Sequence, residues 1–157
     1  MKPLIIAADD YAQSVAIDRG ILSLVEKSRI SAFSCLVLSP RWPEAARSIT
    51  ADIRSKADVG VHLDFTQYPQ ATRARLPLLI LKSLLRALPR KALRASIITQ
   101  LNHFEDALGM APDYIDGHQH VHQLPQIRDE LVDVLVQRYP DRSHWLRVAD
   151  PPATDGF

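Results

Sequence analysis

Short apolar runs alternate with helical patterns along almost the whole chain, and this alternation constrains the fold more than any other feature. Strand-like apolar runs occupy residues 4–8, 32–38, 58–65, 113–116 and 144–148. Apolar residues at helical spacing occupy residues 14–27, 42–54, 93–108 and 125–138, and the last residue of the third helix precedes Gly109, a typical C-cap. Repeated strand–helix units of this kind predict an α/β fold with a parallel sheet, either open or closed into a barrel.

Polar residues stand where several of these predicted strands end. Asp9 and Asp10 follow the first apolar run, His62 lies near the end of the third, and His118 follows the fourth. In parallel α/β folds the ligand site lies at the carboxyl ends of the strands. The sequence therefore predicts that these four side chains share one site.

The adjacent acids Asp9 and Asp10 favour a divided role. Neighbouring residues of a regular strand point in opposite directions, so one carboxylate can bind a metal while the other accepts a proton. The alternative is that the acids cap the following helix, a role that Ser14 or Asp18 also fits.

The segment from Asp116 to His122 holds three of the six histidines. Imidazole is the commonest protein ligand for zinc and related metals. Strand alternation would place His118, His120 and His122 on one side, whereas a helical turn would pair His118 with His122. The alternative is a solvated histidine-rich loop. For His62, flanked by apolar residues, the alternative is a core histidine with satisfied hydrogen bonds.

Composition limits the function classes. An apolar content of 46% in 157 residues is sufficient for one packed core, and a formal charge of +1 gives no general attraction to nucleic acid. The single cysteine, Cys35, is expected to be buried and permits no disulfide within one chain. We expect no membrane span and no secretion signal, and hence a cytoplasmic location.

Three motifs carry a family resemblance. Ala8-Asp9-Asp10-Tyr11, Gly60-Val61-His62-Leu63 and the segment Asp116-Gly117-His118-Gln119-His120-Val121-His122 resemble the motifs of the YdjC/ChbG family of carbohydrate deacetylases. That family is related in chemistry to the NodB-type polysaccharide deacetylases. The resemblance runs from the first strand to the region of Arg147. It implies a parallel (β/α) barrel and a metal-dependent hydrolase that removes the N-acetyl group of an acetylamino sugar or oligosaccharide.

The resemblance also implies roles for single residues. Asp10, His62 and His118 would bind one divalent ion, with Mg²⁺ or Zn²⁺ favoured and Mn²⁺ or Co²⁺ also compatible, and Asp9 would be the general base. Four further residues would act around them: Asp116 by orienting a ligand, His120 and His122 as acid, sugar contact or ligand support, and Arg147 as a substrate contact or an ordinary surface salt bridge.

Two departures from the family pattern carry expectations. Tyr11-Ala12 stands where the family usually has Phe-Gly, and Ala12 is expected to exclude a positive-φ backbone. The chain also holds only about five strand–helix units, whereas a complete barrel of this kind has ~250 residues. We therefore expect residues 1–157 to be a single partial domain, truncated at its C-terminal end. We expect a homo-oligomer to cover the open edges of this partial barrel. We also expect the catalytic turnover of the chain to be impaired. The alternative function is a metal- or sugar-binding remnant.

One basic and apolar segment belongs to no motif. No acid occurs between Phe65 and Phe104, whereas seven basic residues do. Residues 66–93 are predicted to be an insertion or lid that attracts an acidic sugar or an anionic lipid head group. The alternative is a packed helical excursion with a solvated basic face.

Overall fold

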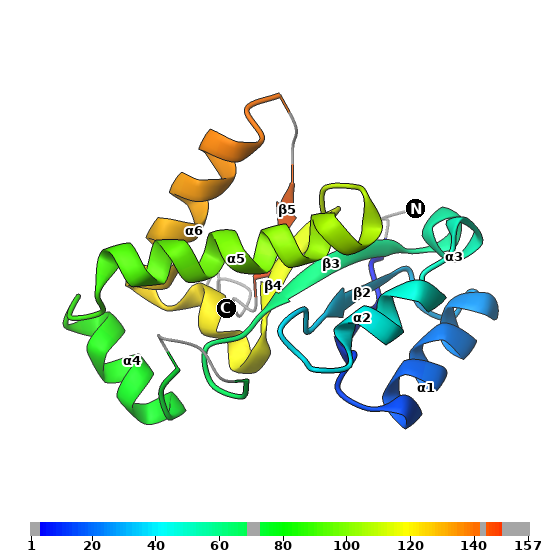
Figure 1. The fold of residues 1–157 in the computed structure, drawn as a ribbon, viewed down its shortest axis with the longest axis horizontal. Helices are drawn as coiled ribbons and strands as arrows, with labels where there is room; N and C mark the ends of the chain where they lie inside the picture. Colours follow the sequence, from blue (N-terminus) through cyan, green and yellow to red (C-terminus); the bar gives the residue numbers. More distant parts are fainter. Residues whose placement is uncertain (1–3, 69–72, 142–143, 149–157) are drawn as a thin grey trace, which may run out of the picture.

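Five parallel strands form one sheet in the order in which they occur along the chain (Figure 1). The computed structural model describes residues 4–68, 73–141 and 144–148. Its strands are β1 (Ala7–Tyr11), β2 (Ala32–Cys35), β3 (Asp58–Leu63), β4 (Tyr114–Gly117) and β5 (Trp145–Leu146). The α/β class and the parallel sheet predicted from the alternating pattern are therefore confirmed.

Helical segments connect consecutive strands. They are α1 (Val15–Glu26), α2 (Trp42–Ala45), the 3₁₀ turn η1 (Ala46–Ser48), α3 (Ala51–Lys56), α4 (Leu76–Leu84), α5 (Arg90–Leu108), the 3₁₀ segment η2 (His118–Gln123) and α6 (Pro125–Arg138). Ser14, one of the residues considered for this role, caps α1 by accepting a hydrogen bond from the Ile17 amide. Gly109 ends α5 in the left-handed conformation, as predicted. Among the described residues, no helix is both long and apolar enough to cross a membrane.

Some predicted boundaries were wrong. The single helix expected over residues 42–54 is broken into α2, η1 and α3, because Thr50 leaves the helical conformation and caps α3 through the Ile53 amide. The helix expected from residue 93 begins at Arg90, directly after Pro89. β2, β3 and β5 are shorter than the apolar runs that predicted them, whereas β1 and β4 keep the predicted length but are shifted along the chain.

The first strand begins later than predicted. Leu4, Ile5 and Ile6 precede β1 and are exposed, whereas Asp9 and Asp10 lie within it. The pairing of β1 with β2 shifts between Ala8 and Tyr11, which is the signature of a β-bulge. The acids therefore occupy an irregular strand and do not follow a regular one.

The longest helix, α5, covers the middle of the sheet (Figure 1). It packs against β3 and α6, and its buried side chains recur every three or four residues: Leu93, Ile97, Leu101 and Phe104. The thiol of Cys35 is fully buried in the same core, as expected, and burial raises its pKa.

The segment that was predicted as an insertion or lid contains α4. Leu79 is buried, whereas Leu78, Leu81, Leu84 and Leu85 are exposed. Gln126 of α6 ties the segment down, since its side chain accepts from the Leu88 amide and donates to the Leu88 carbonyl. The part of the segment from α4 to Leu88 therefore packs on α6, and the role of the segment as a lid stays a prediction.

Candidate metal centre

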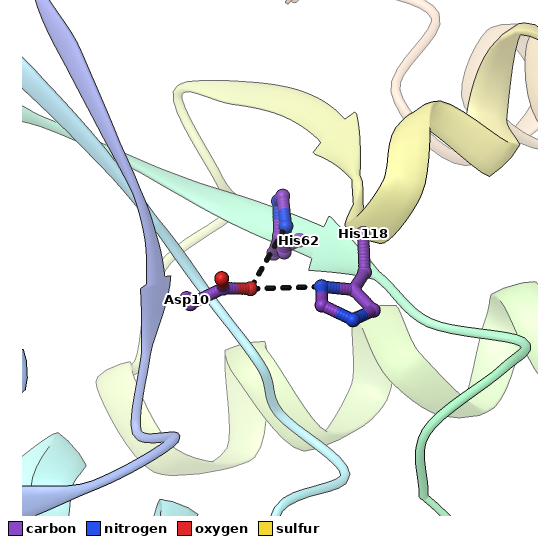
Figure 2. Close-up of side chains that lie close together, drawn as sticks. All are labelled: Asp10, His62 and His118. Carbon is purple, nitrogen blue, oxygen red and sulfur yellow. Dashed lines mark hydrogen bonds and ion pairs between the residues drawn. The ribbon is translucent and has the colours of Figure 1, made fainter.

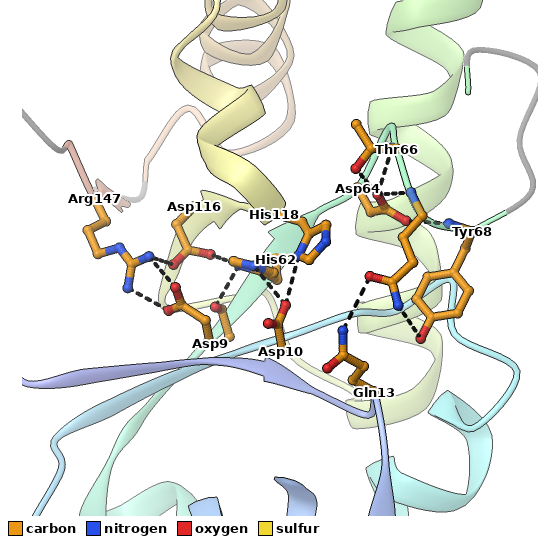
Figure 3. A network of polar contacts seen from close by, with 12 residues as sticks. Asp9, Asp10, Gln13, His62, Asp64, Thr66, Tyr68, Asp116, His118 and Arg147 are labelled. Carbon is orange, nitrogen blue, oxygen red and sulfur yellow. Dashed lines mark hydrogen bonds and ion pairs between the residues drawn. The ribbon is translucent and has the colours of Figure 1, made fainter. Parts of the chain in front are cut away.

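The bulge in β1 places two consecutive carboxylates on one side of the strand. Asp10 has φ 65°, in the left-handed region, at the point where the register shifts. Figure 3 shows Asp9 and Asp10 both rising from β1 toward His62 and Asp116. The expected opposite orientation of adjacent residues holds only for a regular strand, so that prediction was wrong for this pair.

Asp10, His62 and His118 converge from three strand ends (Figure 2). Oδ1 of Asp10 lies 3.3 Å from Nε2 of His62 and 2.9 Å from Nδ1 of His118. Ligand atoms that share a cation at bond lengths of about 2.0–2.2 Å lie about 2.8–3.1 Å apart in octahedral geometry and about 3.3–3.6 Å apart in tetrahedral geometry. The donor types and both spacings therefore fit a divalent ion, and these three side chains lie close together, as a common site would require.

His62 lies between two carboxylates. Its Nδ1 is 2.6 Å from Oδ1 of Asp116 and 3.0 Å from Oγ of Ser34. Burial lowers the pKa of His62, but the hydrogen bonds to Asp10 and Asp116 outweigh it, and the pKa rises to about 9. With Nδ1–H donating to Asp116, Nε2 faces Asp10 and is free to exchange its proton for a cation.

The neighbouring histidines also change the pKa of Asp10. Hydrogen bonds with His118 and His62 hold the pKa of Asp10 well below its usual range. Asp10 is therefore a carboxylate at neutral pH, which is the form that binds a cation.

Arg147 makes a bidentate contact with Asp9, the other acid of the pair. Its Nη1 and Nη2 each lie 2.6 Å from an oxygen of Asp9, and Nη2 also lies 3.2 Å from Oδ2 of Asp116. This bidentate contact raises the pKa of Arg147. Asp9, His62 and Asp116 form a second cluster of ligand-type atoms, but Arg147 already contacts both of its carboxylates.

The histidine-rich segment folds in neither of the two ways considered. Gln119 and His120 take positive φ values of 54° and 58°, which interrupts η2. His118 faces Asp10, His120 is exposed and His122 is buried. His122 donates from Nε2 to the Arg147 carbonyl at 2.7 Å, and burial lowers its pKa. The structure therefore separates the three histidines into three environments.

Ala12 contradicts the expectation that it excludes a positive φ, because its φ is 74°. Two hydrogen bonds hold this turn: the Ala12 amide donates to Oδ1 of Asp18 at 2.7 Å, and its carbonyl accepts from Oγ of Ser39 at 2.6 Å. The turn thus keeps the geometry that a glycine would adopt with less strain.

A hollow of about 410 Å³ adjoins His118. Asp64 shapes one of its walls by accepting hydrogen bonds from the amides of Thr66, Gln67 and Tyr68 (Figure 3). The hollow is lined by Thr66, Gln67, Arg73, Arg75, Leu76, His118 and Gln119. Its polar and cationic lining lies directly beside the candidate metal ligands.

Sequence reasoning missed Ser34 and the loop role of Asp64. Ser34 is fully buried and contacts His62. A polar residue inside the apolar run 32–38 was the available signal for Ser34, and an acid after the strand that carries His62 was the signal for Asp64.

Comparison with known proteins gives a consistent family. The chain is 26% identical to a chitooligosaccharide deacetylase of Enterobacter sp. over 99% of its own length and 68% of the relative. It is 26% identical to a carbohydrate deacetylase of Geobacillus stearothermophilus over 98% of its length and 64% of the relative. For a carbohydrate deacetylase of Xenopus laevis the identity is 24%, with 50% of the relative covered. The chain thus spans from half to about two thirds of the length of these relatives.

A solved structure shares the fold. It is the crystal structure of a protein from Enterococcus faecalis V583 whose proposed role is cellobiose-phosphate cleavage, with a TM-score of 0.68 at 24% identity. The match covers 93% of this chain and 58% of that one. The five strands therefore correspond to part of the fold of that protein. The model of the YdjC-like protein family matches residues 3–156, and the chain belongs to that family.

Proposed function

We propose that this chain removes the N-acetyl group of an acetylamino sugar by metal-dependent hydrolysis. The observation that supports this most is the convergence of Asp10, His62 and His118 beside a further carboxylate, that of Asp9. Asp9 is hydrogen-bonded to Arg147 and to none of these three side chains. Two imidazoles and one carboxylate leave room on a cation for water and for a substrate oxygen. The deacetylase names of the relatives support the same reaction.

Asp10, His62 and His118 would hold the cation. A bound divalent ion supplies Lewis acidity, which makes water more acidic and an acetamide carbonyl more electrophilic. Asp116 orients His62 from behind through Nδ1, which fixes the tautomer that presents Nε2. Mg²⁺ and Zn²⁺ are the favoured ions.

Asp9 would accept the proton of the attacking water. Each carboxylate oxygen has two lone pairs, and Arg147 occupies one on each oxygen, so acceptor capacity remains. The Asp9 side chain is 37% exposed, which keeps it accessible to water. Arg147 also fixes the direction in which the carboxylate points, because a bidentate contact sets the plane of both groups.

The reaction also requires a proton for the leaving amine when the C–N bond breaks. His122 is poorly suited to deliver it, since its ring is 3% exposed and its Nε2–H is bonded to the Arg147 carbonyl. His120 is exposed and close in sequence to His118.

We assign the sugar to the hollow beside His118, where Arg73 and Arg75 would favour a substrate with an anionic group.

The test combines metal content with acetate release from an N-acetylglucosamine oligomer, for the wild type and for Asp10→Ala. We expect one metal per chain and acetate release, with both lost in the variant. The matched control is Asp52→Ala, which removes an exposed carboxylate that pairs with Lys56. Metal without acetate would support the binding-only alternative, and a wild type that binds no metal would overturn the proposal.

A further inference from the structure

His122, the last histidine of the histidine-rich segment, is hydrogen-bonded to the backbone of Arg147. Nε2 of His122 donates to the Arg147 carbonyl at 2.7 Å, and a carbonyl can only accept, so the proton lies on Nε2. The ring is 3% exposed and packs against Gly117, where a Cβ would lie 2.9 Å from Nδ1. His122 is therefore fixed in place by the strand that also leads to His118.

Among the described residues, the backbone of Arg147 has few other anchors. It follows β5, whose pairing with β4 consists of Tyr114 with Trp145 and Ile115 with Leu146. Its amide donates to the Ile115 carbonyl at 3.2 Å. Within the described part of the chain, the His122 bond is the contact that fixes the carbonyl side of this residue. Edge strands this short separate easily from a sheet.

The side chain of Arg147 reaches the candidate general base. Its two terminal nitrogens each contact an oxygen of Asp9 at 2.6 Å (Figure 3). The buried imidazole, the Arg147 backbone, its guanidinium and the Asp9 carboxylate thus form a continuous chain of contacts. A shift of the Arg147 backbone would move the guanidinium, and the orientation of Asp9 with it.

We propose that His122 is a positioning residue for the hydrolysis, acting through Arg147 on Asp9, and neither a metal ligand nor the proton donor. This inference rests on the proposed function for its kinetic consequence. The structural consequence, loss of order at β5 and Arg147, stands without it. A misplaced catalytic group costs up to about a hundredfold in rate.

The decisive experiment is a double-mutant cycle of His122→Ala and Arg147→Ala, measured as kcat and KM for acetate release from an N-acetylglucosamine oligomer. We expect His122→Ala to lower kcat by about ten- to hundredfold, with little change in KM or metal affinity. His122→Gln, which places an amide N–H near the position of Nε2, restores most of the loss. In the Arg147→Ala background, removing His122 changes kcat by less than about twofold.

The control is His103→Ala, which removes another histidine contact to a carbonyl, that of Val37 at 3.3 Å, outside the site. It is expected to leave kcat unchanged. An equal loss from His122→Ala with and without Arg147 would overturn the proposal, as would failure of the Gln variant to restore kcat.

A second measurement is independent of turnover. Hydrogen exchange of the Trp145, Leu146 and Arg147 amides in the metal-free protein should accelerate in His122→Ala and return toward wild type in His122→Gln. Unchanged exchange in His122→Ala would overturn the positioning role. If the wild type released no acetate, the proposed function would fail, while this measurement would still decide whether His122 anchors Arg147.

Discussion

The carboxylate of Asp116 lies 2.6 Å from Nδ1 of His62, on the side of the ring opposite to Asp10. Asp116 is fully buried and His62 is 2% exposed, so the contact is shielded from water. A buried carboxylate behind an imidazole both selects its tautomer and raises its basicity as a ligand.

Asp116→Asn is expected to weaken metal binding by about 10- to 100-fold without abolishing it. The amide keeps the shape of the carboxylate but cannot balance the charge of the ring. Calorimetric titration with Zn²⁺ or Mg²⁺ measures the change. Asp52→Asn, at an exposed position, serves as the control, and an Asp116→Asn variant with wild-type affinity would contradict the proposed orienting role.

Metal binding should be pH-dependent because His62 must lose a proton to present Nε2. The pKa of His62 is raised to about 9, so the apparent metal affinity should rise by about tenfold per pH unit below that value. Proton release measured in buffers of different ionisation enthalpy checks this. Affinity that is flat between pH 6.5 and 9 would rule out His62 as a titrating ligand.

The metal-free protein should respond to pH in the opposite direction. A folded-state pKa raised from 6.5 to about 9 contributes stability that is complete below pH 6.5 and is lost as the pH rises through 9. Thermal melting in the presence of a chelator should therefore show a falling Tm across this window. In His62→Gln this part of the pH dependence should disappear.

Gly60→Ala should destabilise the protein by about 1–3 kcal/mol. A Cβ at Gly60 would lie 2.6 Å from the ring of Tyr114, which is stacked on Trp145 at 4.0 Å. Gly20→Ala is the matched control, because a Cβ there meets nothing within 4 Å and Gly20 lies inside α1. That variant should be stabilised by up to about 1 kcal/mol. Urea unfolding measures the change in the free energy of unfolding for both variants. A stabilised Gly60→Ala variant and a destabilised Gly20→Ala variant would contradict the packing argument.

Ala12→Gly should stabilise the protein by about 1 kcal/mol, because alanine is strained at a φ of 74°. The same type of substitution at Ala95, exposed within α5, should destabilise by about 0.5–1 kcal/mol. Thermal or chemical unfolding of the pair separates backbone strain from the general effect of glycine on the unfolded chain.

The parallel sheet and the close approach of Asp10, His62 and His118 could be predicted, because strand–helix alternation and polar residues at strand ends are local patterns. Asp10, His62 and His118 each carried such a signal. The direction of each side chain could not be predicted in this way. The bulge at Asp10 and the positive φ values at Ala12 and His120 carry no such local pattern, and the turn at Ala12 is held in part by Ser39, 27 residues away.

The residue that pairs with Asp9 could not be predicted from the sequence either. Asp9 and Arg147 are 138 residues apart, and a bidentate contact between them has no local pattern. The sequence supported Arg147 as a substrate contact or a surface salt bridge. The structure shows a 26% exposed side chain paired with Asp9 and Asp116, inside the site.

Because the sheet follows the order of the chain from β1 to β5, the site gathers residues from almost the full span between Asp9 and Arg147. During synthesis the first two strands can pair long before His118 has left the ribosome. The candidate cation ligands Asp10, His62 and His118 are all available once η2 has emerged. The ion pair of Asp9 with Arg147 can form only later, after β5 has emerged. A nascent chain that stops before Arg147 would therefore contain the candidate cation ligands but lack the contact that orients Asp9.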